Sequence, residues 1–448
     1  MATLSDERSI EAPPVASLER KPGENQVLWT IWLTYGAFYF CRTNLSAAVP
    51  GMESAISEGG LGLTGGEVGT ILASLKIAYG VGQLLNGQAS ERISPRVLLA
   101  LGMFGSAALN VLFGLSTGFY FLLFVWACNG YCQSLGWTPC IRVVGNWFPV
   151  LRRGAAIGLI GTGYQVTLGL TYLVAGQSAD MLGWRGALYV PAALLVAAGL
   201  VMLLFLRETP EAHVSARTPT GMPPQRHRAD GSWIENLFLT LSNPMLWLLG
   251  LVLGLVNACR YGFVDWGVSH LMSVQETTVG KATLTYIVLA FGAVLGSYLA
   301  GWATDRFLGG RRAPVICVLL GLLGVLTLVY EQVARSSVAG TILLLVVIGF
   351  CIYGPQVLLV GTAPADLAKR GTPAAAAGFV NFLGYMGAAM GDRVTGHYKQ
   401  EEFGGWDLAI YIWAGWAFAA ALVAALMWNA TAKSDDGSSG AVDVQNTE

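Results

Sequence analysis

Two arginines stand inside long apolar stretches, where a permanent charge needs a partner or a cavity. Arg42 follows the sequence FYFC, and Arg260 follows VNAC, with no acidic residue three or four positions from either. A charged side chain in lipid costs at least about 2.5–3.5 kcal/mol, so it normally faces one or the other. A guanidinium group binds phosphate through two parallel hydrogen bonds and keeps its charge. We expect the pair to converge on an anion, and a doubly negative phosphate fits better than a carboxylate or a neutral sugar. Pairing with an acid on another helix is the alternative.

Other ionisable residues also lie inside apolar stretches. Lys76 is expected near the middle of its helix, where a cavity role is favoured over snorkelling or pairing with a distant acid. Arg142 is expected to support packing near an inner helix end rather than to contact a ligand. Asp392 and Arg393 are neighbours, and adjacent helical residues point about 100° apart, so they are not expected to pair with each other. The sequence leaves the role of these two residues open.

No catalytic arrangement appears in the residue pattern. The sequence has no Ser-His-Asp set, no phosphate-cradling glycine loop outside apolar helices and no metal-ligand cluster. Its seven cysteines fall in apolar segments, where we interpret them as small core residues. His270 and His397 lie near the predicted outer helix ends, where simple solvation is favoured over proton coupling. We therefore predict no enzymatic activity, no cofactor and no metal site.

Composition indicates that lipid is the solvent for much of the surface. The chain has 448 residues, of which 54% are hydrophobic and only 12% are charged. Soluble domains usually carry about 25% charged residues, so too little polar surface is present to coat a globule of this size. Its 57 glycines are typical of helices that pack closely within a membrane. The net charge of −1 gives no indication of nucleic-acid binding.

Apolar runs of transmembrane length divide the chain into twelve expected helices. About 20 apolar residues span the hydrocarbon core of a bilayer as a helix. The expected segments are 27–50, 66–90, 97–115, 119–148, 154–180, 186–206, 244–272, 282–304, 313–331, 339–366, 373–398 and 407–430. The predicted organisation is a disordered tail over 1–26, a six-helix bundle over 27–206, a linker over 207–243, a second six-helix bundle over 244–430 and a disordered tail over 431–448.

The distribution of basic residues predicts that both termini are cytoplasmic. Of the 26 Lys and Arg residues, this topology places 17 on the inner side, 4 on the outer side and 5 inside helices. Cytoplasmic loops carry an excess of Lys and Arg, so the split supports a multi-pass protein of the inner or plasma membrane with this orientation.

The two halves of the chain repeat one another. The sequence GQASER at 87–92 returns as GWATDR at 301–306, an offset of 214 residues. Arg42 and Arg260 are 218 residues apart, and the Arg-Gly pairs that begin at 153 and 370 are 217 apart. Such a repeat indicates two pseudo-symmetric bundles that hold a substrate between them near the membrane midplane.

These motifs resemble the major facilitator superfamily, and more specifically its organophosphate:phosphate antiporter family. The resemblance rests on the GxxxER and GxxxDR loops, on Arg42, on RYGFVDW from Arg260, and on GWTPC at 136–140 with Arg142. It covers about residues 27–430 and implies an all-α membrane protein, the twelve-helix major facilitator fold.

The resemblance also assigns residues around the two arginines. Tyr35, Tyr39 and Tyr79 match positions that line the cavity in relatives. Two positions depart from the family pattern. A lysine of several members is Gln83 here, and Lys76 is expected to replace its charge from the same helix face. A histidine of the glycerol-3-phosphate transporter is Tyr164 here. Tyr164 is expected at the binding site, but the difference argues against copying that specificity.

The function that the resemblance implies is exchange of a small organophosphate for inorganic phosphate by a monomer. The alternative is a membrane sensor of external sugar phosphate with the same binding site. The pairs Glu91-Arg92 and Asp305-Arg306 are expected to gate the cytoplasmic side by contacting neighbouring helix ends only when that side is closed. Loop charges that merely set topology are the alternative for these four residues.

Overall fold

Helices form every regular element in the part of the chain that the structure describes. The computed structural model describes residues 21–210, 238, 240–307, 311–364 and 373–428. The predicted tail over 431–448 lies outside these residues, as do most of the predicted tail over 1–26 and most of the predicted linker over 207–243.

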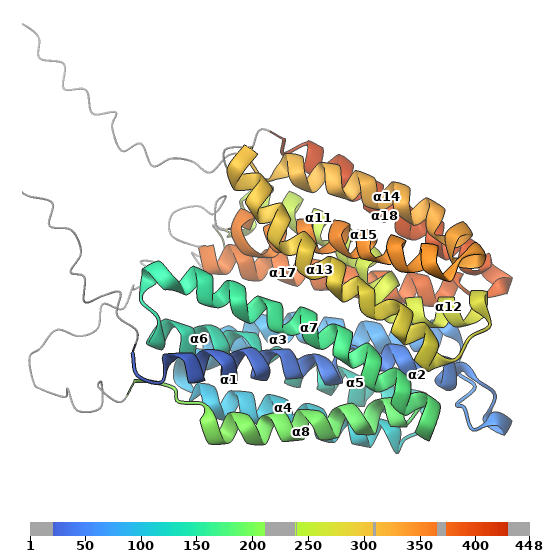
Figure 1. The fold of residues 1–448 in the computed structure, drawn as a ribbon, viewed down its shortest axis with the longest axis horizontal. Helices are drawn as coiled ribbons and strands as arrows, with labels where there is room; N and C mark the ends of the chain where they lie inside the picture. Colours follow the sequence, from blue (N-terminus) through green and yellow to red (C-terminus); the bar gives the residue numbers. More distant parts are fainter. Residues whose placement is uncertain (1–20, 211–237, 239, 308–310, 365–372, 429–448) are drawn as a thin grey trace, which may run out of the picture.

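Two groups of helices lie side by side in the fold (Figure 1). The first group comprises α1 (Glu24–Ala37), the 3-10 turn η2 (Phe38–Cys41), α2 (Leu45–Glu53), the 3-10 turn η3 (Ile56–Glu58), α3 (Gly65–Arg92), α4 (Pro95–Gly114), α5 (Phe119–Ser134), α6 (Trp137–Trp147), α7 (Val150–Leu182) and α8 (Gly186–Phe205).

The second group occupies the upper half of Figure 1. It comprises α11 (Pro244–Tyr261), the π-helical turn η4 (Gly262–Trp266), α12 (Gly267–Gln275), α13 (Val279–Phe307), α14 (Ala313–Ser336), α15 (Val338–Val357), the π-helical turn η5 (Leu358–Thr362), α17 (Pro373–Tyr398), the 3-10 turn η6 (Glu401–Phe403) and α18 (Gly405–Ala425). We call the two groups the N-bundle and the C-bundle.

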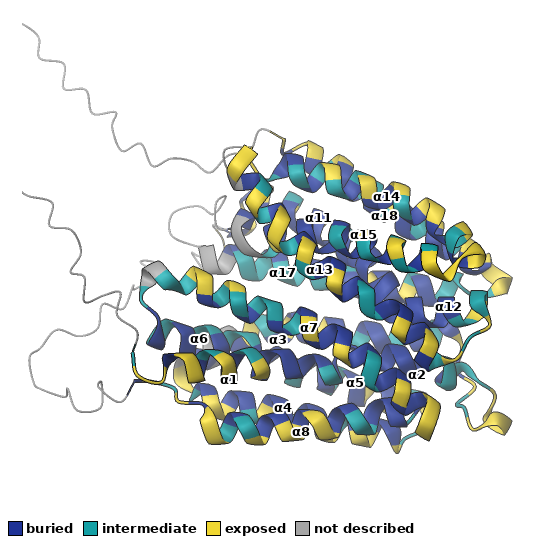
Figure 2. Cartoon of the chain, in the orientation of Figure 1, coloured by how far each residue is buried: buried dark blue, intermediate teal, exposed yellow. Residues whose placement is uncertain are grey.

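The outward faces of both bundles are apolar. Large hydrophobic side chains such as Leu204, Leu343 and Leu422 are more than two-thirds exposed, and Figure 2 shows exposed positions along the outer helices. Among the described residues, nine helices are long and apolar enough to cross a membrane. Three of the twelve predicted segments are not among these nine. The segments near residues 27–50 and 119–148 are each formed by shorter consecutive helices, and the third, α17, carries Asp392 and Arg393 within its length.

The helices that carry the two arginines are both interrupted at those residues. In the first, η2 ends at Cys41 and α2 begins only at Leu45, so Arg42 lies in a break. Asn129 donates a hydrogen bond of 2.9 Å to the Cys41 carbonyl that this break leaves free. In the second, α11 ends one residue after Arg260 and continues as the π-helical turn η4. Interrupted helices within a membrane are tolerated where the backbone is buried in protein or lines a cavity.

The bundles contact each other closely at one end, which we call the closed end. There Lys399 pairs with Glu53 at 2.6 Å, and Thr278 donates to Asp180 at 2.9 Å. Toward the middle of the bundles, Gln165 of α7 donates to the Ser297 hydroxyl of α13 at 2.6 Å. α3 packs against α17, and α7 packs against α13, across the boundary between the bundles.

Glycine permits the tightest of these approaches. A Cβ at Gly69 of α3 would lie 2.5 Å from the Asp392 carbonyl oxygen of α17, and one at Gly176 of α7 would lie 1.8 Å from the Thr283 hydroxyl of α13. Small residues let helix backbones approach in a membrane, where lipid supplies no hydrophobic drive for helix association.

Candidate functional site

Arg42 lies in an aromatic cage within the N-bundle. Its side chain is buried, with a residue exposure of 6%, and its guanidinium carbon lies 4.5 Å from the ring centroid of Tyr39 and 4.6 Å from that of Tyr79. Its Nε donates to the Gln133 side-chain oxygen at 3.0 Å. Its Nη2 donates to the Gln133 backbone carbonyl at 3.4 Å, and Nη1 has no hydrogen-bond partner among the described residues. The aromatic faces thus stabilise the cation and leave a donor for a ligand.

Arg260 has a matching environment in the C-bundle. Its exposure is 3%, and its guanidinium carbon lies 4.7 Å from the Tyr261 ring and 4.8 Å from the Tyr353 ring. Its Nε has no hydrogen-bond partner of ordinary geometry in the described part of the chain. Within that same part, neither arginine forms an ion pair with a carboxylate. The sequence has no acid three or four positions from either arginine. In the described part of the chain, no acid on another helix pairs with either arginine.

Tyrosine rings connect the surroundings of the two arginines. Tyr39 stacks on Tyr164 at 5.0 Å between ring centroids, and Tyr35 lies against both, at 6.4 Å and 6.2 Å respectively. Across the bundle boundary, Tyr79 contacts Tyr385, and the rings that contact Arg260 are Tyr261 and Tyr353. The predicted residues Tyr35, Tyr39, Tyr79 and Tyr164 are thus brought together around the arginines.

Two tyrosines close the cage across the bundle boundary. Tyr79 of α3 contacts Tyr385 of α17 at 4.4 Å between ring centroids. Gln83, at the position where the family resemblance leads us to expect a lysine, donates to the Tyr79 hydroxyl at 2.9 Å. This residue therefore positions a cage tyrosine instead of supplying a charge.

Lys76 does not face the cage as an unpaired cation. It forms ion pairs with Asp265 of η4 and with Asp392 of α17, the latter at 2.5 Å. Its Nζ also lies 4.5 Å from the Tyr261 ring, whose centroid is 4.7 Å from the Arg260 guanidinium carbon. The ion pairs match the alternative of pairing with a distant acid, and the shared ring also places Lys76 beside the cage.

Sequence reasoning left several residues of the site unassigned. Gln133, Tyr353 and Tyr385 contact the arginines or the cage tyrosines, but an amide or a tyrosine in an apolar helix is too common to stand out. Asp265 and Asp392 did carry a signal, because an acid inside an apolar segment needs a partner. Neither acid has Lys76 as a sequence neighbour, so the tertiary pairing was not visible.

The prediction that His270 is solvated is wrong. His270 is fully buried, not solvated: its Nδ1 lies 3.2 Å from the Tyr330 hydroxyl and its Nε2 lies 2.5 Å from the Glu331 carboxylate. Helix α14 supplies both partners, so the bundle covers a position that sequence alone places at a helix end. His397 is half-buried and stacks on Phe403, with ring centroids 4.2 Å apart.

The predicted gating pairs lie at helix ends away from the closed end. Glu91 and Arg92 end α3, and Asp305 and Arg306 lie near the end of α13. Arg92 and Arg306 are exposed, while the side chains of Glu91 and Asp305 are outside what the structure describes. Arg142 donates to the backbone carbonyl of Ile93 at 2.8 Å, which matches the expected packing role.

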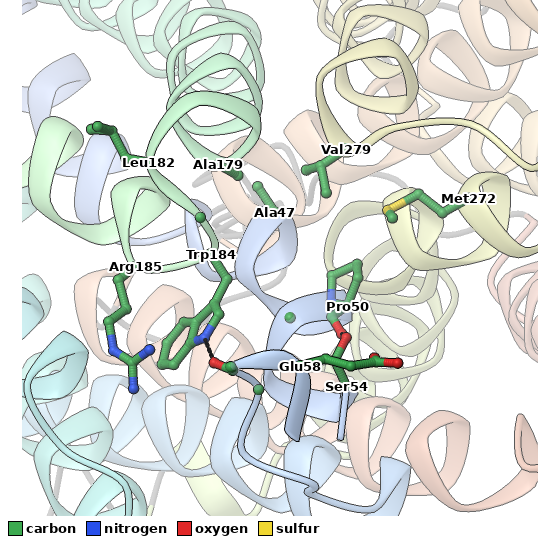
Figure 3. A pocket seen from close by; sticks show the side chains of 14 residues that line it. Ala47, Pro50, Ser54, Glu58, Ala179, Leu182, Trp184, Arg185, Met272 and Val279 are labelled. Carbon is green, nitrogen blue, oxygen red and sulfur yellow. Dashed lines mark hydrogen bonds between the residues drawn. The ribbon is translucent and has the colours of Figure 1, made fainter. Parts of the chain in front are cut away.

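A cavity of about 430 Å³ lies at the closed end, apart from the aromatic cage. Figure 3 shows Ala179 and Leu182 of the N-bundle on one side and Met272 and Val279 of the C-bundle on the other. Trp184 donates to the Gly59 carbonyl at 3.2 Å beneath it. None of the predicted binding residues lines this cavity.

Comparison with known proteins identifies the class of protein that this fold and site define. The family profile of the Major Facilitator Superfamily matches residues 31–391, and the chain belongs to that superfamily. A bacterial homologue of the human lysosomal transporter Spinster has the same fold, with a TM-score of 0.70 and 17% identity over 92% of this chain and 96% of its own. The predicted twelve-helix, all-α membrane fold is confirmed, as is the prediction of a transporter rather than an enzyme.

Curated relatives narrow the class further. A probable hexose phosphate transport protein of Chlamydia trachomatis is 28% identical over 95% of this chain and 96% of its own length. The glycerol-3-phosphate transporter of Bacillus subtilis is 29% identical over 90% and 92%, respectively. The membrane sensor protein UhpC of Salmonella typhimurium is 30% identical over 89% and 88%. These relatives confirm the resemblance to the organophosphate:phosphate antiporter family.

Proposed function

We propose that this protein exchanges a small organophosphate, of the sugar phosphate or glycerol phosphate class, for inorganic phosphate by alternating access. The observation that carries the proposal is the pair of caged arginines, one from each bundle. Arg42 and Arg260 are buried without a carboxylate, and each retains a nitrogen without a partner among the described residues. A dianionic phosphate would neutralise both cations and accept hydrogen bonds from both forks.

Exchange follows from the charge of the empty site. Without an anion, the site holds two buried guanidinium groups, one from each bundle, and little water is present to screen the repulsion between them. That repulsion opposes the movement of one bundle over the other, whereas a bound phosphate group removes it. Either inorganic phosphate or an organophosphate supplies this negative charge. One anion can therefore permit the conformational change in one direction, and the other anion can permit the return.

The Lys and Arg distribution supports an orientation with both termini in the cytoplasm. In that orientation the closed end, with Glu53 and Lys399, is the outer end. The conformation would then be closed to the outside. We further propose that one chain suffices for transport, because the arginines and their cage all come from the same chain.

Reconstitution tests the proposal directly. The purified chain in vesicles loaded with labelled phosphate should release label when unlabelled phosphate, glucose 6-phosphate or glycerol 3-phosphate is added outside, and not when glucose or glycerol is added. Arg185→Lys provides a matched control for Arg42→Lys, because Arg185 stacks on Trp184 at the closed end. Release that ignores external phosphate compounds would rule out exchange.

A sensor is the second candidate, and the similarity to UhpC over 89% of this chain favours it. A sensor would bind the same ligands but catalyse little exchange. Ligand-dependent thermal stabilisation in detergent together with negligible phosphate release would favour the sensor. Stabilisation accompanied by release would favour the antiporter.

A further inference from the structure

One lysine and two aspartates form a buried cluster across the bundle boundary. Lys76 belongs to α3 of the N-bundle, whereas Asp265 and Asp392 belong to the C-bundle. Their side-chain exposures are 4%, 3% and 0%, respectively. Both carboxylates contact the same Nζ atom, so they also lie close to each other. We call these three residues the ionic triad.

The charges of the ionic triad do not balance. One ammonium and two carboxylates sum to −1, in a region that is closed to water. Apart from the ion pair with Lys76, neither oxygen of Asp392 accepts a hydrogen bond of ordinary geometry from a described residue. Two carboxylates that share one site resist ionising together, and burial of an uncompensated charge adds to that resistance.

The surroundings offer little further compensation. The groups that face Asp392 are Lys76 of α3, Asp265 and Trp266 of η4, and Tyr261 beside Lys76. Arg260 contacts the Tyr261 and Tyr353 rings and forms no ion pair with Asp265 or Asp392. Arg393 donates away from the ionic triad to the Gly66 carbonyl, at 3.2 Å.

Other acids near the same helix lie in solvent. Glu401 and Glu402 of η6 are exposed, and Asp407 of α18 is 66% exposed beside Arg335. Helix α18 contributes the uncharged Trp413, which donates a hydrogen bond of 2.9 Å to the Thr395 hydroxyl of α17. Lys76 is therefore the cation that directly compensates the two buried carboxylates.

We propose that the Asp265–Asp392 carboxylate pair binds one proton when the two bundles close over the ionic triad, and releases it when they part. The proton converts one carboxylate to a carboxylic acid and brings the charge of the ionic triad from −1 to zero. When the bundles separate around the ionic triad, Lys76 moves away with the N-bundle, and water solvates both carboxylates. The closed form then binds more protons than the open form, so acidity favours closure.

This proposal is independent of the transported substrate, and its test needs none. A cysteine introduced as Ala73→Cys reports opening, because Ala73 is buried one turn from Gly69 and Lys76 on α3. Met181→Cys, at a position 81% exposed at the end of α7, reports the reactivity of an accessible thiol. Both chains are purified in detergent and labelled with a polar maleimide between pH 5.5 and 8.5, with labelling of the native cysteines subtracted.

The ratio of the two labelling rates cancels the titration of the thiol itself. We expect this ratio to increase with pH, by at most about tenfold per pH unit for one proton. Asp392→Asn should abolish the increase and hold the ratio low, because the amide is neutral at every pH. Asp265→Asn should do the same, which keeps the test decisive if one variant fails to fold.

Two controls separate the ionic triad from other titrating groups. Glu53→Gln and His397→Gln should retain the increase, because neither residue belongs to the ionic triad. Burial lowers the pKa of Lys399, and the facing Glu53 carboxylate only partly offsets this. Because the pKa of Lys399 is lower in the closed form, titration of Lys399 would favour closure as the pH rises. The proposed effect of the ionic triad has the opposite sign, since it favours closure as the pH falls. A flat ratio in the parent chain, or an increase that persists in both aspartate variants, would overturn the proposal.

Discussion

Lys76 of α3 and Asp392 of α17 form an ion pair of 2.5 Å that joins the two bundles from within. Asp265 shares the same ammonium group, so one cation holds two acids of the opposite bundle. Removing one partner of a buried ion pair costs about 3–5 kcal/mol, because the other charge stays buried without compensation. The relationship makes Lys76 a contact between bundles as well as a neighbour of the binding cage.

Lys76→Met should therefore lower the apparent Tm of the purified protein, since it leaves two carboxylates without a cation. Adding Asp392→Asn to this variant should raise the Tm again, because one of the uncompensated charges is removed. The measurement is thermal unfolding of the three chains in the same detergent. A double variant that is less stable than Lys76→Met would contradict the assigned contact.

The two arginines should be intolerant of a change that keeps the charge. Arg42→Lys and Arg260→Lys each lose the planar fork, and hydrogen bonds to charged groups contribute about 1.5–3 kcal/mol. We expect phosphate exchange to fall roughly 10- to 100-fold in either variant, with membrane insertion intact. The Arg185→Lys variant should exchange normally. Near-normal exchange by a well-expressed Arg42→Lys or Arg260→Lys variant would remove the phosphate-clamp assignment.

Much of this arrangement could be predicted from sequence, and the limits have physical causes. Arg42 and Arg260 stood out because charge in an apolar run is costly, and the repeat placed them in equivalent helices of the two halves. Lys76 stood out for the same reason, but its partners are 189 and 316 positions away and belong to the other bundle. Spacing rules reach only one or two helical turns, so they cannot find such a partner.

His270 shows a second limit. Its position near the end of a transmembrane segment predicted solvation, yet α14 covers it and supplies both Tyr330 and Glu331. Burial of a helix end depends on which neighbour packs against it, and that is a property of the bundle rather than of the segment. The aromatic cage could be predicted only in part. The family resemblance indicated Tyr35, Tyr39, Tyr79 and Tyr164 but not Tyr353 or Tyr385.

Gln133 should determine whether Arg42 remains available for an anion. Its side-chain oxygen accepts a hydrogen bond from Arg42 Nε and holds the guanidinium in place. Gln133→Glu would place a carboxylate at that position and neutralise the arginine, so phosphate binding should be nearly lost. Gln133→Leu removes one hydrogen bond but adds no charge, and its KM for phosphate should rise only about tenfold. Equal losses in the two variants would indicate that Gln133 acts only by packing.

Asp305 provides the last prediction, which concerns the helix ends away from the closed end. We propose that its carboxylate contacts neighbouring helix N-termini when the cytoplasmic side closes, a contact worth about 0.3–1 kcal/mol. Asp305→Asn would weaken that state and shift the resting population toward the form open to the cytoplasm. A difference of about 1 kcal/mol changes the ratio of the two forms roughly fivefold.

A cysteine on α7, on the cytoplasmic side of Tyr164, would report that shift. Gly161→Cys suits the purpose, because a Cβ at Gly161 meets nothing within 4 Å and Tyr164 lies one turn further along α7. Maleimide labelling from the cytoplasmic side should quicken in Asp305→Asn and stay unchanged in Arg311→Gln, which alters an exposed charge in the same region. Phosphate affinity, measured in a variant locked in one conformation, should not respond to Asp305→Asn. Unchanged labelling together with altered affinity would show that Asp305 acts on the binding site instead of on the gate.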